Sequence, residues 1–288
     1  MKYTNLFLLF VICMPFLAKA QSNDAQWSKK ELRKQRPTYL ELSSGLNYSS
    51  FRDFATSPLF YNGAGLDFSL AGVSFDSHFE SVSGFRMVGG LYLASVQQNF
   101  TSSLGASFYA YYSRLYKVES LSGERFNFKT GGRIDLATNV RSNGSLGNNG
   151  FGLELIPTLF GSVKTTFDVS RKTAIDKHLW FIKCHREVRK RSLSYQLNLG
   201  IVNTSYRNGY IYNNQSFLLN DEKTFAGYVF SAFSGFRMNS SLDYTIYLKN
   251  CNAVRFTYLW EAYQTGGELD KFELASHSFK FALLFNTK

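Results

Sequence analysis

One stretch of the sequence, RFNFKTGGRIDLATNV from Arg125 to Val140, constrains the fold more than any other. Residues of one parity are apolar or small: Phe126, Phe128, Thr130, Gly132, Ile134, Leu136, Thr138 and Val140. The other parity carries amide and charged side chains, among them Lys129, Arg133 and Asp135. A period of two is typical of a β-strand between two different surroundings. Strands of soluble proteins usually have about five or six residues, so a run of about sixteen indicates an environment that requires long strands.

The same alternation continues from Pro37 almost to the C-terminus. The candidate strands, about twelve in all, are residues 39–48, 65–79, 84–97, 104–118, 125–140, 151–167, 178–187, 192–206, 224–237, 241–249, 253–264 and 272–285. The parity shifts at Ala71–Gly72, which predicts a β-bulge. With twelve strands, the long connection at 207–223 falls on the periplasmic side, where short turns are expected. A further hairpin near Asn208–Gly209 would remove this conflict and give about fourteen strands.

The N-terminal segment has the features of a secretory signal peptide. Lys2 precedes an apolar stretch, and Ala18-Lys19-Ala20 is a small-x-small cleavage site, so we expect residues 1–20 to be removed. Residues 21–37 are polar and basic, with Lys29, Lys30, Arg33, Lys34 and Arg36. This segment is expected to be a periplasmic arm, either solvated or in contact with anionic lipid or a partner. Residues 38–288 form one further domain, since no linker or composition break divides them.

The polar face decides which way the apolar face points. Alternating strands can bury their apolar face in a soluble barrel or sandwich, or turn it outward into lipid. Here the polar parity mixes charged residues with Gly, Ser and Thr, which suit a crowded or water-filled lumen. Strands of ten to sixteen residues also exceed the roughly nine to eleven that a tilted membrane strand needs. The sequence therefore predicts an all-β fold, a single transmembrane antiparallel barrel of about 12 to 14 strands.

The outward-apolar assignment predicts which charged side chains line the lumen. The candidates are Lys129, Arg133, Asp135, Asp243, Arg255, Glu261 and Lys280. These charges of both signs either pair and close the interior or leave a narrow polar passage. On parity alone, Leu136→Arg should block assembly, whereas Asp135→Asn should be tolerated.

The signal peptide, the alternating strands and the final strand SHSFKFALLFNTK resemble those of bacterial outer-membrane β-barrels. Rich in Asn, Lys, Ser and Phe, the composition is similar to that of proteins from Bacteroidota. The resemblance covers Tyr39 to Lys288 and is to the class as a whole. It implies location in the bacterial outer membrane and recognition of the aromatic end of the last strand by the barrel-assembly machinery. Three residues follow Phe285, whereas the class usually ends on an aromatic residue.

The charge balance points to anionic partners in the envelope. The chain has 32 Lys and Arg residues against 21 Asp and Glu. For an exported chain, lipid phosphates and glycolipid head groups are the expected partners, and nucleic acid is not. The densest basic run is KCHREVRKR, from which the candidates for binding lipid or an acidic partner are Lys183, Arg186, Arg189, Lys190 and Arg191. The alternative is a solvated hairpin turn.

No catalytic, cofactor or metal site is expected. The histidines lack metal-ligand spacing with Cys184 or the carboxylates. RSNGS at 141–145 resembles part of the outer-membrane phospholipase motif, but Val140 stands where that motif has its histidine. His277 lies between Ser276 and Ser278, a pair of residue types that barrel lipases also use. Without the motif histidine, we expect no enzymatic activity.

Three classes of function remain open. The first is a channel for small polar solutes, and the second is a barrel subunit or scaffold of a larger envelope complex. The third is a barrel-embedded hydrolase. A soluble exported all-β binding protein is a further alternative, which would have a different fold. The first two are preferred jointly.

Overall fold

The structure is a computed structural model that describes residues 36–96, 99–179, 182–208, 228–265, 267 and 271–288. Its described residues form β-strands and two short 3-10 helices, η2 (Glu119–Leu121) and η3 (Gly144–Asn149). The strands are β1 (Thr38–Asp53), β2 (Ser57–Phe75), β3 (Phe79–Val96), β4 (Asn99–Lys117), β5 (Phe126–Ser142), β6 (Phe151–Asp168), β7 (Ile175–Leu179), β8 (Ile182–Arg186), β9 (Arg191–Asn208), β10 (Tyr228–Ala232), β11 (Phe236–Tyr247), β12 (Ala253–Gln264) and β13 (Phe272–Asn286). Within these residues, no helix is long and apolar enough to cross a membrane.

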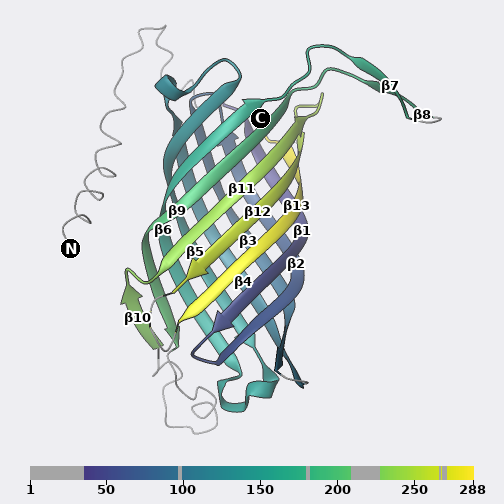
Figure 1. The fold of residues 1–288 in the computed structure, drawn as a ribbon. Helices are drawn as coiled ribbons and strands as arrows, with labels where there is room; N and C mark the ends of the chain where they lie inside the picture. Colours follow the sequence, from purple (N-terminus) through teal and green to yellow (C-terminus); the bar gives the residue numbers. More distant parts are fainter. Residues whose placement is uncertain (1–35, 97–98, 180–181, 209–227, 266, 268–270) are drawn as a thin grey trace. The chain divides into compact units, whose positions relative to one another are not determined.

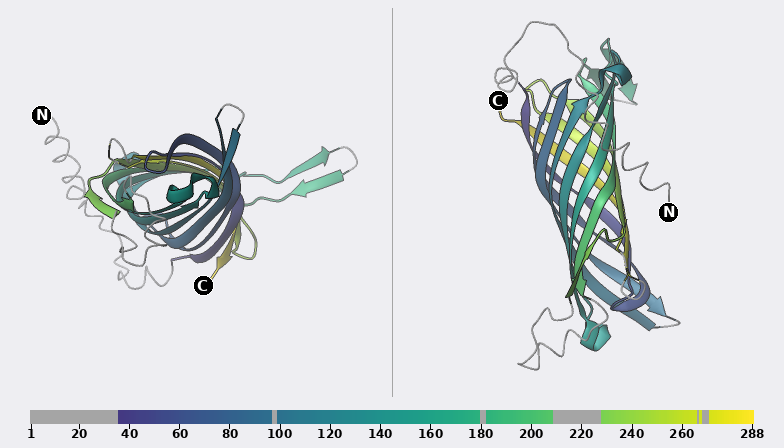
Figure 2. Two further views of the ribbon diagram at one scale, coloured as in Figure 1. Left: turned by 90° about the horizontal axis from the view of Figure 1, so that it is seen from below. Right: turned by 90° about the vertical axis from the view of Figure 1, so that its left-hand side faces the viewer.

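The long strands pair into one antiparallel sheet that closes on itself (Figure 1). In the described part of the chain, the order around the barrel is β9, β11, β12, β13, β1, β2, β3, β4, β5 and β6, and β6 pairs with β9 to close the ring. Figure 2 shows the strands tilted around a common axis. Closure matters because every strand then has a hydrogen-bonding neighbour on both sides and no open edge remains between them.

The expected count of about 12 to 14 strands is too high, since two candidates do not become separate barrel strands. The candidate at 178–187 falls mainly on β7 and β8, a hairpin that forms its own two-stranded sheet. The candidate at 224–237 falls mainly on β10, which pairs with β9 only over Tyr228↔Asn208 to Ala232↔Thr204. Alternation predicts a strand but not the sheet that it joins. The postulated hairpin near Asn208–Gly209 lies largely outside the described residues.

A local kink separates β10 from β11. Both strands pair with β9 on the same side, β10 near its C-terminal end and β11 nearer its start. Between them Phe233 and Gly235 have positive φ values of 53° and 74°. A left-handed backbone cannot continue a ladder, so one strand position around the barrel is divided into two elements.

The predicted bulge at Ala71–Gly72 is wrong. The pairing of β1 with β2 stays regular there, with Glu41 opposite Ala71 and Leu40 opposite Gly72. Shifts of register occur instead between Arg52 and Asp53, at the end of β1, and between Leu159 and Phe160, where β6 pairs with β9. Gly72 simply occupies an outward position, and its missing side chain makes the apolar pattern look interrupted.

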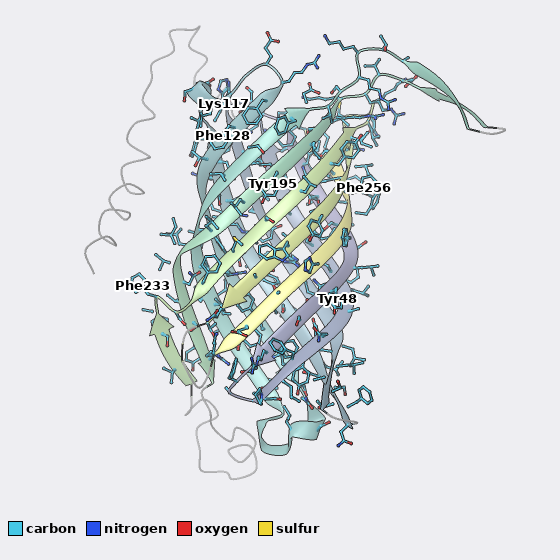
Figure 3. All side chains as sticks on the ribbon, in the orientation of Figure 1. Tyr48, Lys117, Phe128, Tyr195, Phe233 and Phe256 are labelled. Atoms are coloured by element: carbon cyan, nitrogen blue, oxygen red, sulfur yellow. The ribbon has the colours of Figure 1, made fainter. Side chains whose placement is uncertain are left out.

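The barrel is apolar outside and polar inside. Each of its strands carries exposed large apolar side chains, such as Leu46 (68% exposed), Ile134 (61%) and Phe279 (65%). Figure 3 shows Tyr48, Tyr195 and Phe256 on this outer face. The inward parity is buried and polar, as at Asp67 and Asp135. Because soluble monomers rarely expose apolar surface on this scale, the predicted outward direction of the apolar face agrees with the structure.

An even number of barrel strands places Thr38 and Asn286 at the same end, where Thr287 N donates to Thr38 O over 2.9 Å. We call this the terminus end. The connections at 76–78, 118–125, 169–190 and 248–252 belong to it. At the opposite end lie the turn at 54–56, the end of β3 and the connections that leave β5, β9 and β12. The long connection after β9 therefore leaves from the end away from the termini, whereas the connection at 169–190, which is also long, belongs to the terminus end.

Candidate functional site in the barrel lumen

A chain of ion pairs crosses the middle of the lumen. Arg86 on β3 bridges Asp67 on β2 (Nε to Oδ2, 2.9 Å) and Glu261 on β12 (Nη1 to Oε2, 3.0 Å). Arg237 on β11 then links Glu261 (2.9 Å) to Asp135 on β5 (3.1 Å). Strands β13, β1 and β2 separate β12 from β3 around the wall, so Arg86 and Glu261 meet across the lumen. We call these five residues, with Arg133 bound to Asp135 at 2.6 Å, the middle network.

A second set closes the lumen near the opposite end. Asp53 on β1 binds Arg141 on β5 at 2.6 Å and Arg207 on β9 at 2.7 Å. Glu154 on β6 binds the same two arginines, at 3.1 Å and 3.2 Å. Two carboxylates and two guanidinium groups thus alternate in a ring, which we call the charged ring. All four side chains are buried, and each ion is next to two of opposite sign, the arrangement that offsets the cost of desolvating them.

Aromatic side chains fill the space beside the charged ring. Phe51, Tyr61 and Phe272 point inward and are buried, and Phe51 stacks on Tyr61 with ring centroids 5.1 Å apart. The Arg141 guanidinium lies 4.1 Å from the Phe272 ring centroid, a cation–π contact. The hydroxyl of Tyr263 on β12 accepts a hydrogen bond from Asn139 Nδ2 on β5. This end of the lumen therefore has a packed core around its ions.

Toward the terminus end the inward charges are grouped more loosely. Glu80 on β3 accepts from Lys164 on β6 at 2.5 Å and lies 3.6 Å from Lys129. Arg255 on β12 binds Glu41 on β1 at 2.6 Å. Small inward residues lie between these pairs, including Ser43, Gly45, Ser69, Ser113, Ser162 and Ser194. Large side chains also pack at this end, where Tyr39, Val73 and Leu284 belong to a buried apolar cluster against which Phe75 and Tyr247 pack.

All the predicted lumen candidates point inward: Lys129, Arg133, Asp135, Asp243, Arg255, Glu261 and Lys280. The structure brings Arg133, Asp135 and Glu261 into the middle network, and Lys129 and Arg255 into the terminus-end pairs. Asp243 and Lys280 form no ion pair with another described residue. Asp243 accepts from Thr257 Oγ1 at 2.6 Å, and Lys280 donates to Ser69 Oγ at 3.4 Å.

Several members of these networks were not among the candidates: Asp53, Asp67, Glu80, Arg86, Arg141, Glu154, Lys164, Arg207 and Arg237. Some lie just beyond the expected strand ends, as Asp53, Arg141 and Arg207 do. Arg86 lies within an expected strand, between the apolar Phe85 and Met87. A charge between two outward apolar residues is the signal that identifies an inward position. Strand boundaries placed too early hid Asp53, Arg141 and Arg207, whereas Glu154, Lys164 and Arg237 lie within expected strands.

His277 is not part of a catalytic set among the described residues. It lies on the outward face of β13 next to Tyr258, whose hydroxyl is 2.7 Å from His277 Nδ1. Ser276 and Ser278 have the opposite parity and are buried inside the barrel, so the wall separates them from His277. Ser145 belongs to η3 at the opposite end. The described residues also contain no His, Cys, Asp or Glu cluster that could hold a metal ion.

The basic candidates all lie on the connection from β6 to β9 at the terminus end. Lys183 and Arg186 belong to β8, where the structure describes the backbone but not the side chains. Arg189 and Lys190 follow and are exposed, and Arg191 begins β9. Cys251 is exposed in the β11–β12 turn, and the side chain of Cys184 lies outside the described part.

No protein-family model and no curated protein matches the sequence. Among solved structures, the chain is similar to the transport unit of the autotransporter AIDA-I from Escherichia coli (8% identity, 98% and 97% of the two chains covered, TM-score 0.46). It is also similar to the outer membrane protease OmpT from Escherichia coli (6%, 87% and 95%, 0.45). A third is the translocator domain of the autotransporter NalP from Neisseria meningitidis (9%, 98% and 98%, 0.36). Similarities this low carry no argument about function.

Proposed function

We propose that this chain is an integral β-barrel of a bacterial outer membrane, without catalytic activity, that serves as a closed barrel subunit or scaffold of a larger envelope complex. The observation that carries the proposal is the middle network, because its ion pairs join opposite walls and occupy the path that a solute would take. The charged ring blocks the same path a second time, nearer the opposite end.

The outer face supports the membrane assignment. Hydrocarbon offers no hydrogen bonds, so a membrane-spanning sheet must satisfy its backbone internally, and a closed barrel does so. The barrel strands have 12 to 19 residues, more than the roughly nine to eleven that a tilted span needs. With the signal sequence at residues 1–20 and both barrel termini at one end, the terminus end faces the periplasm in this proposal.

The energetics of the lumen support closure. Removing one partner from a buried ion pair typically costs about 3 to 5 kcal/mol, because the other charge is left without compensation. Arg237 and Glu261 are both almost fully buried and bind each other at 2.9 Å. Opening a passage would separate several such pairs at once. A static, ion-paired interior is therefore favoured over a conducting one.

A channel for small polar solutes is the second candidate. It is favoured by the small inward residues near the terminus end and by Lys280 and Asp243, which form no ion pair with described residues. The same end also holds the buried apolar cluster around Tyr39, Val73 and Leu284, which would have to move aside for solutes to enter. The middle network would then have to rearrange before solutes could pass.

Assembly of the barrel implies a further partner in this proposal. The outward side chains of β13 include Phe279, Phe281, Leu283 and Phe285, all exposed. Strand β13 pairs with β1 along its whole length to join the two ends of the barrel. We propose that the barrel-assembly machinery recognises this final strand, as the aromatic pattern predicts.

The proposal is tested by fractionation and by purification in mild detergent. We expect the mature chain to start near Gln21, to fractionate with the outer membrane and to show heat-modifiable gel migration. Chemical cross-linking in cells followed by mild solubilisation should retain specific envelope proteins in stoichiometric amounts. Recovery in the soluble periplasm would contradict the membrane assignment, and a barrel that never retains a partner would contradict the scaffold role.

A further inference from the structure

The connection between β6 and β9 gathers positive charge at the terminus end. Its described residues contain a set that we call the basic cluster: Arg171, Lys172, Arg189, Lys190 and Arg191. The two arms of the connection are joined at their base, where Arg191 N donates to Ser170 Oγ over 2.9 Å and Val169 N donates to Arg191 O over 3.1 Å. Residues that are about twenty positions apart in sequence are thus held beside each other.

The cluster has more cations than nearby carboxylates: Asp168, at the end of β6, interacts electrostatically with Lys190. None of its five cations forms an ion pair with a carboxylate whose side chain the structure describes. Two guanidinium atoms, Arg171 Nη1 and Arg191 Nε, are buried without a hydrogen-bond partner. Leaving a buried donor unsatisfied is costly. The fork of N–H donors on a guanidinium group matches the oxygens of a phosphate. The neighbouring cations Lys117 and Lys249 do have acidic partners, Glu119 and Glu187.

The cluster begins where the apolar outer face ends. Phe167, near the end of β6, and Tyr195, near the start of β9, point outward and are exposed (45% and 44%). Figure 3 shows Tyr195 on the outer wall of the barrel. Arg171 follows Phe167 by four residues, and Arg191 precedes Tyr195 by four residues on the same strand. In a bilayer, lipid head groups lie next to the end of the apolar band.

We infer that the basic cluster binds the phosphate groups of anionic phospholipids in the leaflet at the terminus end. This inference rests on the proposed function, which places that end in the periplasm and so selects phospholipid of the inner leaflet over surface glycolipid. The β7–β8 hairpin extends from the same connection (Figure 1). Because an isolated two-stranded hairpin is marginally stable in water, a charged lipid surface would also stabilise it.

The test measures which lipids the purified full chain retains. The folded protein in mild detergent is incubated with equal amounts of phosphatidylglycerol and phosphatidylcholine, and native mass spectrometry counts the bound lipids. The wild type should retain phosphatidylglycerol preferentially. The variant with Arg171→Gln, Arg189→Gln and Lys190→Gln should lower the ratio of the two lipids by about tenfold. Its control, with Arg52→Gln and Lys271→Gln, removes positive charge at the opposite end of the barrel and should leave the ratio unchanged.

Three outcomes would overturn the inference. These are an equal loss in the control variant, retention of glycolipid in place of phosphatidylglycerol through the same residues, and displacement of the lipid by millimolar inorganic phosphate. Heat-modifiable migration of each variant shows that the barrel is folded. Fractionation tests the proposed function separately, so its failure is distinguishable from a lipid result that contradicts the inference.

Discussion

Asp135 and Leu136 are neighbours in β5, yet their side chains have opposite surroundings. Asp135 is 1% exposed and binds two arginines, whereas Leu136 is 41% exposed on the outer wall. The alternation of the sequence predicts this difference correctly. It does not show that Asp135 joins Arg133 to Arg237, because Arg237 comes from β11, a hundred residues further along the chain. The parity of a residue shows which face of the barrel wall its side chain lies on. Its ion-pair partners are known only from the closed barrel.

The first prediction concerns the outer face. Leu136→Arg places a cation near the middle of a lipid-facing strand, where it costs about 2 to 4 kcal/mol at the bilayer midplane. We expect little or no folded protein in the outer membrane, measured by heat-modifiable migration of the membrane fraction. Leu136→Phe keeps the position apolar and should assemble normally. Equal assembly of both variants would mean that this face does not contact lipid.

The second prediction concerns the inner face and revises the expectation from parity. Asp135→Asn removes the carboxylate that Arg133 and Arg237 share, while Arg237 keeps Glu261, so we expect a loss of up to about 3 to 5 kcal/mol in the free energy of unfolding, measured by urea denaturation in micelles. Adding Arg237→Gln should recover part of the loss. Asp243→Asn is the matched control, because Asp243 forms no ion pair with a described residue. A similar loss in both single variants would argue against the network.

At the scale of elements, the sequence predicts most strands well but predicts poorly which sheet each strand joins. The expected strand at 125–140 corresponds to β5 within two residues at each end. The expected single strand at 178–187 is wrong, because the range is divided between β7 and β8, the two strands of a hairpin outside the barrel sheet. Which sheet a strand joins depends on pairing between distant residues, which a local pattern does not contain. The same limit hid Asp53 and Arg141, because strand ends are set by the neighbouring strand as well as by the local sequence.

The third prediction tests the kink between β10 and β11. Gly235 has a φ of 74°, and a Cβ built there would lie 1.8 Å from Gln264 O. Gly235→Ala should therefore lower the free energy of unfolding by more than the roughly 1 kcal/mol typical of a simple glycine exchange. Gly89→Ala, with open space around its Cβ position, should be neutral or stabilising. Urea denaturation of both variants checks this, and equal stability would show that the kink relaxes freely.

At the scale of the whole molecule, the charge balance of the lumen differs from that of the terminus end. The described inward side chains hold cations and carboxylates in nearly equal numbers. The basic cluster, whose cations form no ion pair with a described carboxylate, lies instead at the terminus end. The net positive charge of the sequence is therefore a poor guide to the lumen, and an anionic partner for the surface stays a proposal. The sequence alone left open whether the lumen charges pair or line a passage. The answer depends on distances between side chains across the barrel, which a local pattern does not contain.

The central claim is that ion pairs close the lumen, and single-channel recording of the purified wild-type barrel in planar bilayers tests it most directly. Folding is verified in the same sample by heat-modifiable migration. The networks predict no conductance steps above the baseline, because the middle network and the charged ring both cross the path of the ions. Steady, long-lived conductance from folded wild-type protein would contradict the closed barrel and favour the channel.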